Sequence, residues 1–173
     1  LDSSSKKIRE TRYSYDYQQY GAAPTKGDLT KNEMWLENGS NPSFSYSYDI
    51  YGNRILEIDP NGNNMLYDYA PDNLFPVKVI NAKLYTTTYS YDSGTGNLLS
   101  VQYPNGARTD YTYDAFGRQT AEISPYDSSD MPTAQKIYAF DGSYPEKVVV
   151  KKKDSDTGSY DEEYTYDGFG KLV

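Results

Sequence analysis

The sequence predicts an all-β fold, built as a tandem array of antiparallel β-hairpins from repeats of about 22 residues. Pairs of aromatic residues recur along the chain, turn signals punctuate it, and helical periodicity is nearly absent. The first members of successive pairs lie 33, 21, 22, 22, 27 and 26 residues apart. Such a period is typical of architectures that add one supersecondary unit after another. The units begin near Tyr13, Tyr46, Tyr67, Tyr89, Tyr111, Tyr138 and Tyr164.

Each aromatic pair predicts a β-strand. Aromatic residues favour a pleated, half-buried surface, and residues two positions apart lie on the same face of a strand. In six of the seven pairs an Asp follows directly. We therefore expect each pair to present two rings side by side and to end at a turn. The regular pairs are Tyr46 and Tyr48, Tyr89 and Tyr91, Tyr111 and Tyr113, and Tyr164 and Tyr166.

The Asp after each pair predicts a tight turn. In the pattern Asp-x-x-Gly the Asp suits the first position of a type I turn and the Gly suits the fourth, and the Asp side chain accepts backbone N–H groups. One connection is a residue longer, as a bulged hairpin requires. These turns run from Asp49 to Gly52, from Asp92 to Gly96, from Asp114 to Gly117 and from Asp167 to Gly170.

In three units seven residues lead from the turn Gly to a Pro, which predicts an outgoing strand, and two of these strands end in Pro-Asn-Gly. Asn-Gly predicts a type I′ hairpin turn, which needs positive φ at both central residues. Apolar residues switch parity between the outgoing strands, so the aromatic pairs are the better guide to the interior. The two Pro-Asn-Gly turns are Pro60, Asn61 and Gly62, and Pro104, Asn105 and Gly106.

Four stretches depart from the regular unit. Residues 29–38 could form a short helix, but they follow Gly27 and Asp28 as an outgoing strand would, so we expect a strand. Ala70 replaces the usual Asp, and residues 71–73 must then supply the turn. Residues 125–132 and 153–159 lengthen two connections, and we expect both at the surface.

Composition excludes several classes of function. The chain has no Cys and no His, which removes the usual general base, the commonest metal ligand and the Ser-His and Cys-His nucleophile pairs. Its net charge of −8 argues against nucleic acid, and no apolar run is long enough to span a membrane. We therefore predict no catalytic residue, no cofactor-binding residue, no metal ligand and no enzymatic activity.

The chain resembles the RHS repeat, or YD repeat, family over residues 13–173. The family pattern is Tyr-Asp, two residues, Gly-Arg or Gly-Asn, an apolar strand and Asp-Pro-Asn-Gly. Tyr48 to Asn53 with Asp59 to Gly62 match it, as do Tyr113 to Arg118. The family includes components of bacterial insecticidal toxin complexes, polymorphic RHS toxins and teneurins.

The resemblance implies a spiralling β-sheet that closes into a hollow shell around a C-terminal toxic polypeptide. It also implies a secreted or cell-surface protein whose partners are the rest of its own polypeptide, a companion shell component, the enclosed toxin domain and a cell-surface delivery component. The family's aspartyl self-cleavage motif, Asp-Pro-x-Gly-Leu-x-Gly, has no match here, since Asn63 follows Gly62. Residues 1–173 are expected to be one array, incomplete at both ends.

Two alternatives remain open. Tyrosine rings stack on sugar faces, so the chain could be a cell-surface adhesin or a carbohydrate-binding repeat module, although regular placement in every unit favours sheet packing. Residues 154–158 resemble the start of a calcium loop, but Ser159 and Thr165 occupy the later places where Gly and Glu are required. A turn rich in Asp, Ser and Gly is the better interpretation.

Overall fold

The structure, a computed structural model, describes residues 7, 9–139, 146–155, 157–167 and 169–173. These residues form thirteen strands, and no helix occurs among them. The strand order in the sheet follows the chain from β1 to β13, and the paired strands are antiparallel. This confirms the predicted all-β array of hairpins. The chain divides into two compact units, Leu1–Thr87 and Thr88–Val173.

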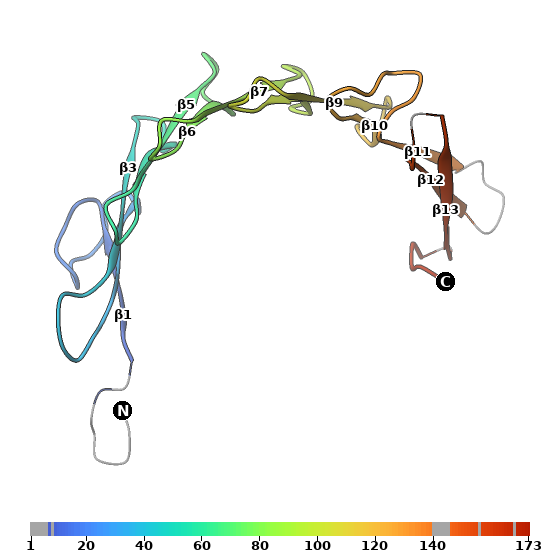
Figure 1. The fold of residues 1–173 in the computed structure, drawn as a ribbon. Helices are drawn as coiled ribbons and strands as arrows, with labels where there is room; N and C mark the ends of the chain where they lie inside the picture. Colours follow the sequence, from blue (N-terminus) through green and yellow to red (C-terminus); the bar gives the residue numbers. More distant parts are fainter. Residues whose placement is uncertain (1–6, 8, 140–145, 156, 168) are drawn as a thin grey trace. The chain divides into compact units, whose positions relative to one another are not determined.

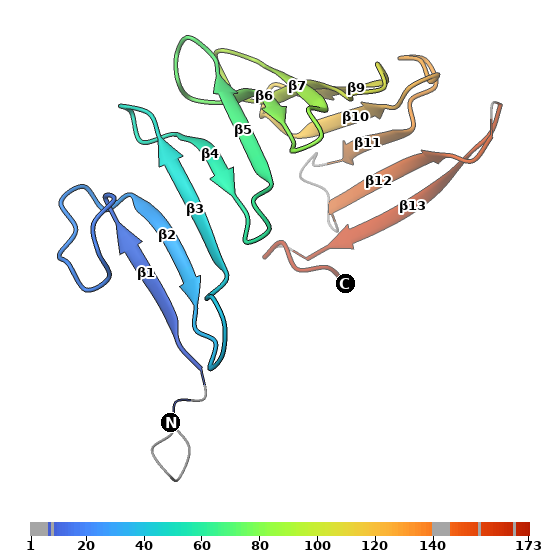
Figure 2. The ribbon, with the colours of Figure 1, turned by 60° about the vertical axis from the view of Figure 1, so that its left-hand side comes forward.

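The first unit holds three hairpins, which Figures 1 and 2 show in succession. Each strand pairs with the next one along the chain. The strand predicted over residues 29–38 is confirmed, although it ends at Met34. The strands are β1 (Thr11–Tyr15), β2 (Leu29–Met34), β3 (Ser43–Tyr48), β4 (Arg54–Ile58), β5 (Asn64–Tyr69) and β6 (Pro76–Ile80).

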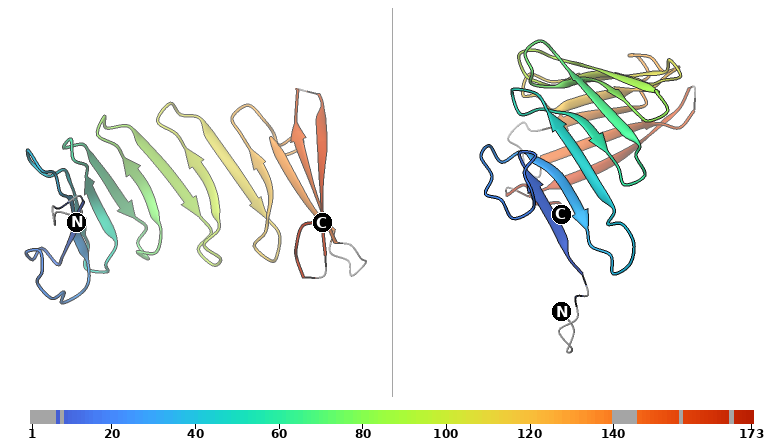
Figure 3. Two further views of the ribbon diagram at one scale, coloured as in Figure 1. Left: turned by 90° about the horizontal axis from the view of Figure 1, so that it is seen from below. Right: turned by 90° about the vertical axis from the view of Figure 1, so that its left-hand side faces the viewer.

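The second unit continues the same pattern, and Figure 3 shows its strands from two further sides. Each strand again pairs with the next, and the longest ladder joins β12 to β13. Phe140 and Asp141, which complete the sixth predicted aromatic pair and begin its turn, lie outside the described residues. The strands are β7 (Thr86–Tyr91), β8 (Leu98–Gln102), β9 (Arg108–Tyr113), β10 (Gln119–Ile123), β11 (Ala134–Ala139), β12 (Glu146–Lys153) and β13 (Ser159–Tyr166).

A β-bulge recurs in the strand that follows five of the aromatic pairs. In the first hairpin Tyr15 pairs with Leu29 and Ser14 pairs with Lys31, so Thr30 is the extra residue. A bulge interrupts side-chain alternation within a strand and increases its twist. The sequence did not reveal it. The equivalent extra residues are Ile55, Val77, Leu99 and Thr120.

The Pro-Asn-Gly turns differ from the type I′ prediction, which was wrong. Gly62 has a φ of 82°, whereas Asn61 is not among the residues with positive φ. The Gly62 N–H donates to the carbonyl oxygen of Asp59 at 3.0 Å, and the Asp59 N–H donates to Asn63 at 3.0 Å. Because Pro60 fixes φ near −65°, it selects a type I turn, and the left-handed Gly closes the three-residue loop. The turn at Pro104 has the same pattern.

The sheet is a single layer with almost no core. Among the described residues only Val101 and Val148 are buried hydrophobic side chains, at 6% and 9% exposure. This explains why apolar residues lie on different faces in different outgoing strands, since neither face is covered and neither requires an apolar side chain.

In the part of the chain that the structure describes, no helix is long and apolar enough to cross a membrane.

Candidate functional site

The aromatic face is the face of each unit that carries the aromatic pairs. Directly paired residues on neighbouring strands share a face, so the register places Tyr89, Val101 and Thr109 in one row on it. Val101 and Thr109 are the buried members of this row. The rings of Tyr89 and Tyr91 lie stacked, with centroids 6.5 Å apart.

The same arrangement recurs at the other end of the second unit. Tyr138 lies opposite Val148, and Val148 lies opposite Tyr164. Val148 is the second buried apolar side chain, whereas the three aromatic pairs of this unit that are fully described are half-buried. Tyrosine thus covers small or branched neighbours here, and the rings themselves stay accessible from one side.

Two arginines lie among the rings of the aromatic pairs, and no pattern in the sequence predicted these contacts. The guanidinium carbon of Arg54 lies 5.3 Å from the ring centroid of Tyr46 and 5.6 Å from that of Tyr67. Arg54 also forms an ion pair with Glu57 at 3.1 Å. Arg118 lies 4.3 Å from the ring centroid of Tyr138. Such cation–π contacts join one aromatic pair to the next.

The second tyrosine of several pairs also makes a hydrogen bond to the preceding hairpin. Its hydroxyl donates to the backbone carbonyl oxygen of the first residue of the strand before it. The strand ladder does not require this bond, so it is an additional link between hairpins. The donor and acceptor pairs are Tyr48 with Leu29 at 2.8 Å, Tyr69 with Arg54 at 3.2 Å and Tyr113 with Leu98 at 2.9 Å.

Burial raises the pKa of Tyr48, Tyr91 and Tyr113 above the ordinary value for tyrosine. The pKa of Tyr46 and that of Tyr111 are also raised, first by burial and then by a nearby glutamate. A phenol with a raised pKa donates hydrogen bonds and does not serve as a base near neutral pH.

The turn aspartates cap the ends of the strands that carry the aromatic pairs. One carboxylate oxygen of Asp49 accepts the N–H groups of Tyr51 at 2.8 Å and Asn53 at 2.9 Å. Asp114 makes the same bonds to Phe116 and Arg118. Burial opposes ionisation of both carboxyl groups, but the N–H groups outweigh it and hold the pKa of each below its usual value.

The fifth residue of these turns completes the cap. The side-chain amide of Asn53 donates to the second oxygen of Asp49 at 3.2 Å, and Arg118 Nε donates to that of Asp114 at 2.6 Å. The arrangement recurs in the turns at the other end of the strands, where the side-chain amide of Asn63 donates to Asp59 at 2.8 Å. The Gly-Asn or Gly-Arg step in the sequence was the signal that could have revealed this role.

The residues singled out in the sequence thus fall into two places. The tyrosines lie on the aromatic face, on alternate strands, and the turn residues lie apart from them at the ends of the strands. The described residues include no group of three or more Asp or Glu side chains that could hold a metal ion. The arrangement supports packing and hydrogen bonding between neighbouring hairpins.

Comparisons with known proteins agree with this geometry. The RHS Repeat family model matches residues 93–129. The tRNA nuclease WapA of Bacillus subtilis strain 168 is 32% identical over 130 residues, which is 71% of this chain and 5% of WapA. The tRNA3(Ser)-specific nuclease WapA of Bacillus spizizenii matches equally, so the chain spans about 5% of the length of these curated relatives.

The fold also matches solved structures. The TcdB2-TccC3-Cdc42 crystal structure aligns with 94% of this chain and 9% of that chain, with a TM-score of 0.63 and 16% sequence identity. The TcdB2-TccC3 structure without its hypervariable C-terminal region gives a TM-score of 0.62 over the same share. With its repeated capped hairpins and its matched repeat segment, the chain belongs to the RHS repeat family.

Proposed function

We propose that residues 1–173 form one array that serves as a non-catalytic wall segment of a secreted RHS toxin-type protein. In this role the array contributes to a β-shell that encloses a C-terminal toxic polypeptide. The observation that carries the proposal is the single-layer sheet, which has two buried apolar side chains among its described residues and shares its fold with TcdB2-TccC3. A sheet with so little core is suited to enclosing something else.

The repeated residues supply the cohesion that a wall needs. The position of Arg54 between two rings and the tyrosine hydroxyl bonds join one hairpin to the next. The turn caps bind backbone N–H groups at both ends of the strands, so these groups do not require a second layer of secondary structure. We assign the Tyr, Asp, Gly, Pro and Asn residues of the repeat to this structural role.

The proposed partners are the rest of the polypeptide, a companion shell component, the enclosed toxin and a cell-surface delivery component. The curated relatives are named as tRNA nucleases, which makes a toxic polypeptide a consistent cargo. The names of the matching structures likewise join two components, TcdB2 and TccC3.

Limited proteolysis of the native polypeptide that carries this chain tests the proposal. We expect the C-terminal part to resist protease in the native protein and to be cut when Tyr111 and Tyr113 are both replaced by Ala, since both rings pack on the aromatic face. Tyr126→Ala is the matched control, because Tyr126 is fully exposed at 103%. Electron cryomicroscopy should show a hollow particle.

Equal protease sensitivity of the C-terminal part in the native protein and the double variant would contradict enclosure. The adhesin alternative predicts glycan binding instead. On a glycan array the native protein would then show saturable binding, and the double variant would lose this binding while its circular dichroism spectrum stays that of a β-protein.

A further inference from the structure

The first hairpin has a long loop between its two strands, where the other described hairpins have a short turn. Residues 16–28 connect β1 to β2, where other units use a turn such as Asp49 to Gly52. The loop starts with two non-glycine residues at positive φ, Asp16 at 55° and Tyr17 at 61°. Such conformations persist where the surrounding structure imposes them, and they often occur at functional sites.

The Asp16 carboxylate holds this loop in place. Its oxygens accept the backbone N–H groups of Lys26 at 2.9 Å, Gly27 at 3.2 Å and Asp28 at 3.0 Å. Burial opposes ionisation, but these bonds prevail and hold the pKa of Asp16 well below its usual range. The Tyr17 N–H also donates to Thr30 Oγ1 at 3.0 Å. The loop is therefore fixed at both ends.

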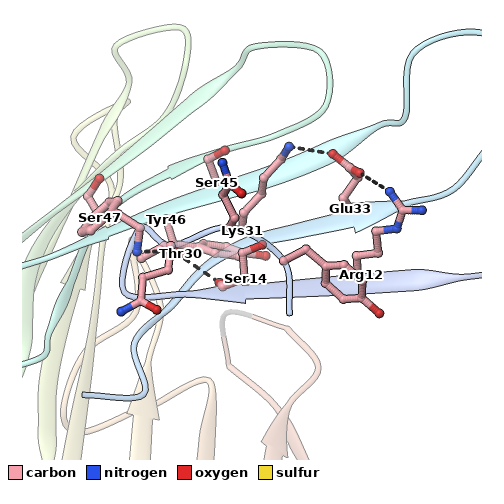
Figure 4. A pocket seen from close by; sticks show the side chains of 12 residues that line it. Arg12, Ser14, Thr30, Lys31, Glu33, Ser45, Tyr46 and Ser47 are labelled. Carbon is pink, nitrogen blue, oxygen red and sulfur yellow. Dashed lines mark hydrogen bonds and ion pairs between the residues drawn. The ribbon is translucent and has the colours of Figure 1, made fainter. Parts of the chain in front are cut away.

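The fixed loop forms one side of a cavity of about 470 Å³, which Figure 4 shows. Tyr17, Gln18 and Tyr20 contribute from the loop, and Ser14 and Ser45 contribute from the sheet. Successive side chains of a strand point to opposite faces, so Ser14, between Tyr13 and Tyr15, lies on the face opposite the aromatic face. The cavity therefore lies mainly along that face, although Tyr46 of an aromatic pair also lines it.

The charges in the cavity are paired with one another. Lys31 Nζ lies 2.6 Å from a carboxylate oxygen of Glu33, and Arg12 lies 3.7 Å from the other oxygen. The Arg12 guanidinium carbon also lies 5.4 Å from the ring centroid of Tyr20. Serine hydroxyl and glutamine amide groups supply further donors and acceptors. The cavity therefore has polar walls with paired charges.

Two aromatic rings of the loop accompany these polar groups, and both are open to solvent. Tyr17 is 71% exposed and Tyr20 is 58% exposed. An aromatic ring offers an apolar surface together with a polar tip. The volume lies within the range of about 300–1,000 Å³ that is usual for small-ligand sites. The ligand that fits should be uncharged, rich in hydroxyl groups and apolar on one side.

We propose that this cavity binds a neutral saccharide. The sugar stacks one face on Tyr20, and its hydroxyl groups exchange hydrogen bonds with Gln18, Ser14 and Ser45. Glu33 disfavours a phosphate or sulfate group, and the serine hydroxyl groups disfavour an apolar ligand, which would leave them without hydrogen-bond partners. This goes beyond the wall function, because the four residues proposed to contact the sugar make none of the contacts assigned to the wall.

A glycan array of neutral hexose and N-acetylhexosamine oligomers, probed with the native polypeptide, provides the first test. Calorimetric titration with the tetrasaccharides that bind, such as cellotetraose or chitotetraose, then measures affinity. Tyr20→Ala should weaken binding at least about tenfold. Gln18→Ala should also weaken it. Tyr51→Ala is the matched control, since Tyr51 is 66% exposed in a turn outside the cavity, and it should leave the affinity unchanged.

Three results would overturn the proposal. The first is the absence of saturable binding to every neutral glycan on the array. The second is binding that Tyr20→Ala and Tyr51→Ala reduce equally, or that neither reduces. The third is displacement of the bound tetrasaccharide by equimolar inorganic phosphate, which would identify the cavity as an anion site. Loss of protease protection is not expected in Tyr20→Ala, so failure of this proposal is distinguishable from failure of the wall function.

Discussion

The phenol hydroxyl of Tyr113 in β9 donates a hydrogen bond of 2.9 Å to the backbone carbonyl oxygen of Leu98, the first residue of β8. Leu98 lies beside the bulge at which the register between β7 and β8 shifts. The same relation joins Tyr48 to Leu29 and Tyr138 to Gln119. Each bond links a strand to the irregular start of its neighbour, where the ladder is interrupted.

Removing this hydroxyl should destabilise the hairpin. We expect Tyr113→Phe to lower the free energy of unfolding by about 1 kcal/mol, the usual net value of one hydrogen bond. Denaturant unfolding followed by circular dichroism measures the change. Tyr111→Phe is the matched control, because among the described residues its hydroxyl has no hydrogen-bond partner. Equal losses in the two variants would show that the bond to Leu98 contributes nothing.

A second prediction concerns Leu84, which occupies the left-handed position of a turn with a φ of 61°. In the corresponding turn Gly62 holds this position. Left-handed backbone costs a non-glycine residue roughly 1–2 kcal/mol, and glycine removes this cost, although the larger entropy that glycine loses on folding cancels part of the gain. Leu84→Gly should therefore raise the thermal midpoint.

The reciprocal change serves as the control for Leu84. Gly62→Leu should lower the thermal midpoint, and since a Cβ built at Gly62 meets no atom within 4 Å, backbone conformation alone would account for the loss. If both substitutions shift the midpoint in the same direction, the left-handed strain is not the cause.

Stability should fall in acid because of the turn aspartates. The side-chain bond from Asn63 and the backbone N–H bonds lower the pKa of Asp59 in the folded state. A lowered folded pKa gives stabilisation that is complete above the unfolded pKa of about 3.9, and this stabilisation is lost as the pH falls through the folded value. Denaturation midpoints measured between pH 6 and about pH 2 should show the loss.

Asp59→Asn tests the origin of that acid sensitivity. Asn81 already occupies the equivalent position and accepts the N–H groups of Lys83 at 2.9 Å and Tyr85 at 3.1 Å, so the amide should retain the turn. The variant should show a shallower dependence of stability on pH than the native protein. An unchanged slope would exclude Asp59 as a contributor.

The long connection between β10 and β11 should depend on one ion pair. Lys153 Nζ pairs with Asp127, which also accepts a bond from Thr133, and the two charged side chains are only 17% and 13% exposed. The hydrogen bond from Lys153 is the main cause of the lowered pKa of Asp127. Lys153→Met leaves this carboxylate unpaired and should make residues 124–133 sensitive to protease.

The matched control for Lys153 is Lys151→Met. Lys151 lies on the same strand, but its partner Asp161 is 50% exposed, and exposed ion pairs contribute little. Cleavage sites identified by mass spectrometry would separate the two cases. If Lys151→Met exposes the connection as much as Lys153→Met, the pair with Asp127 is not what holds it.

The sequence was sufficient for the strands that carry Tyr46 and Tyr48 and for the turns that begin at Asp49 and Asp114, because a local pattern determines each. At Asn61 the prediction from the sequence was wrong, because Asn-Gly suggested a type I′ turn. The residue before it, Pro60, restricts φ and decides the turn type. Two short-range preferences competed there, and the more rigid residue prevailed.

Other features could not be read from the chain because they depend on pairing. The bulge at Thr30 exists only in the register between β1 and β2. Arg54 has two aromatic neighbours because β3 and β5 flank its strand. The cavity beneath residues 16–28 requires both a fixed loop and the adjacent strand face. No local pattern contains such information, since each partner is distant in sequence.

The single-layer architecture also has an evolutionary consequence. Because strands pair with their neighbours in sequence, a change in one turn perturbs one hairpin and leaves no opposite layer to be repacked. The loop at residues 16–28 and the extended connection at residues 124–133 are two such changes. An array of this kind can therefore gain or lose a loop at one turn while the ladders between its other hairpins stay the same.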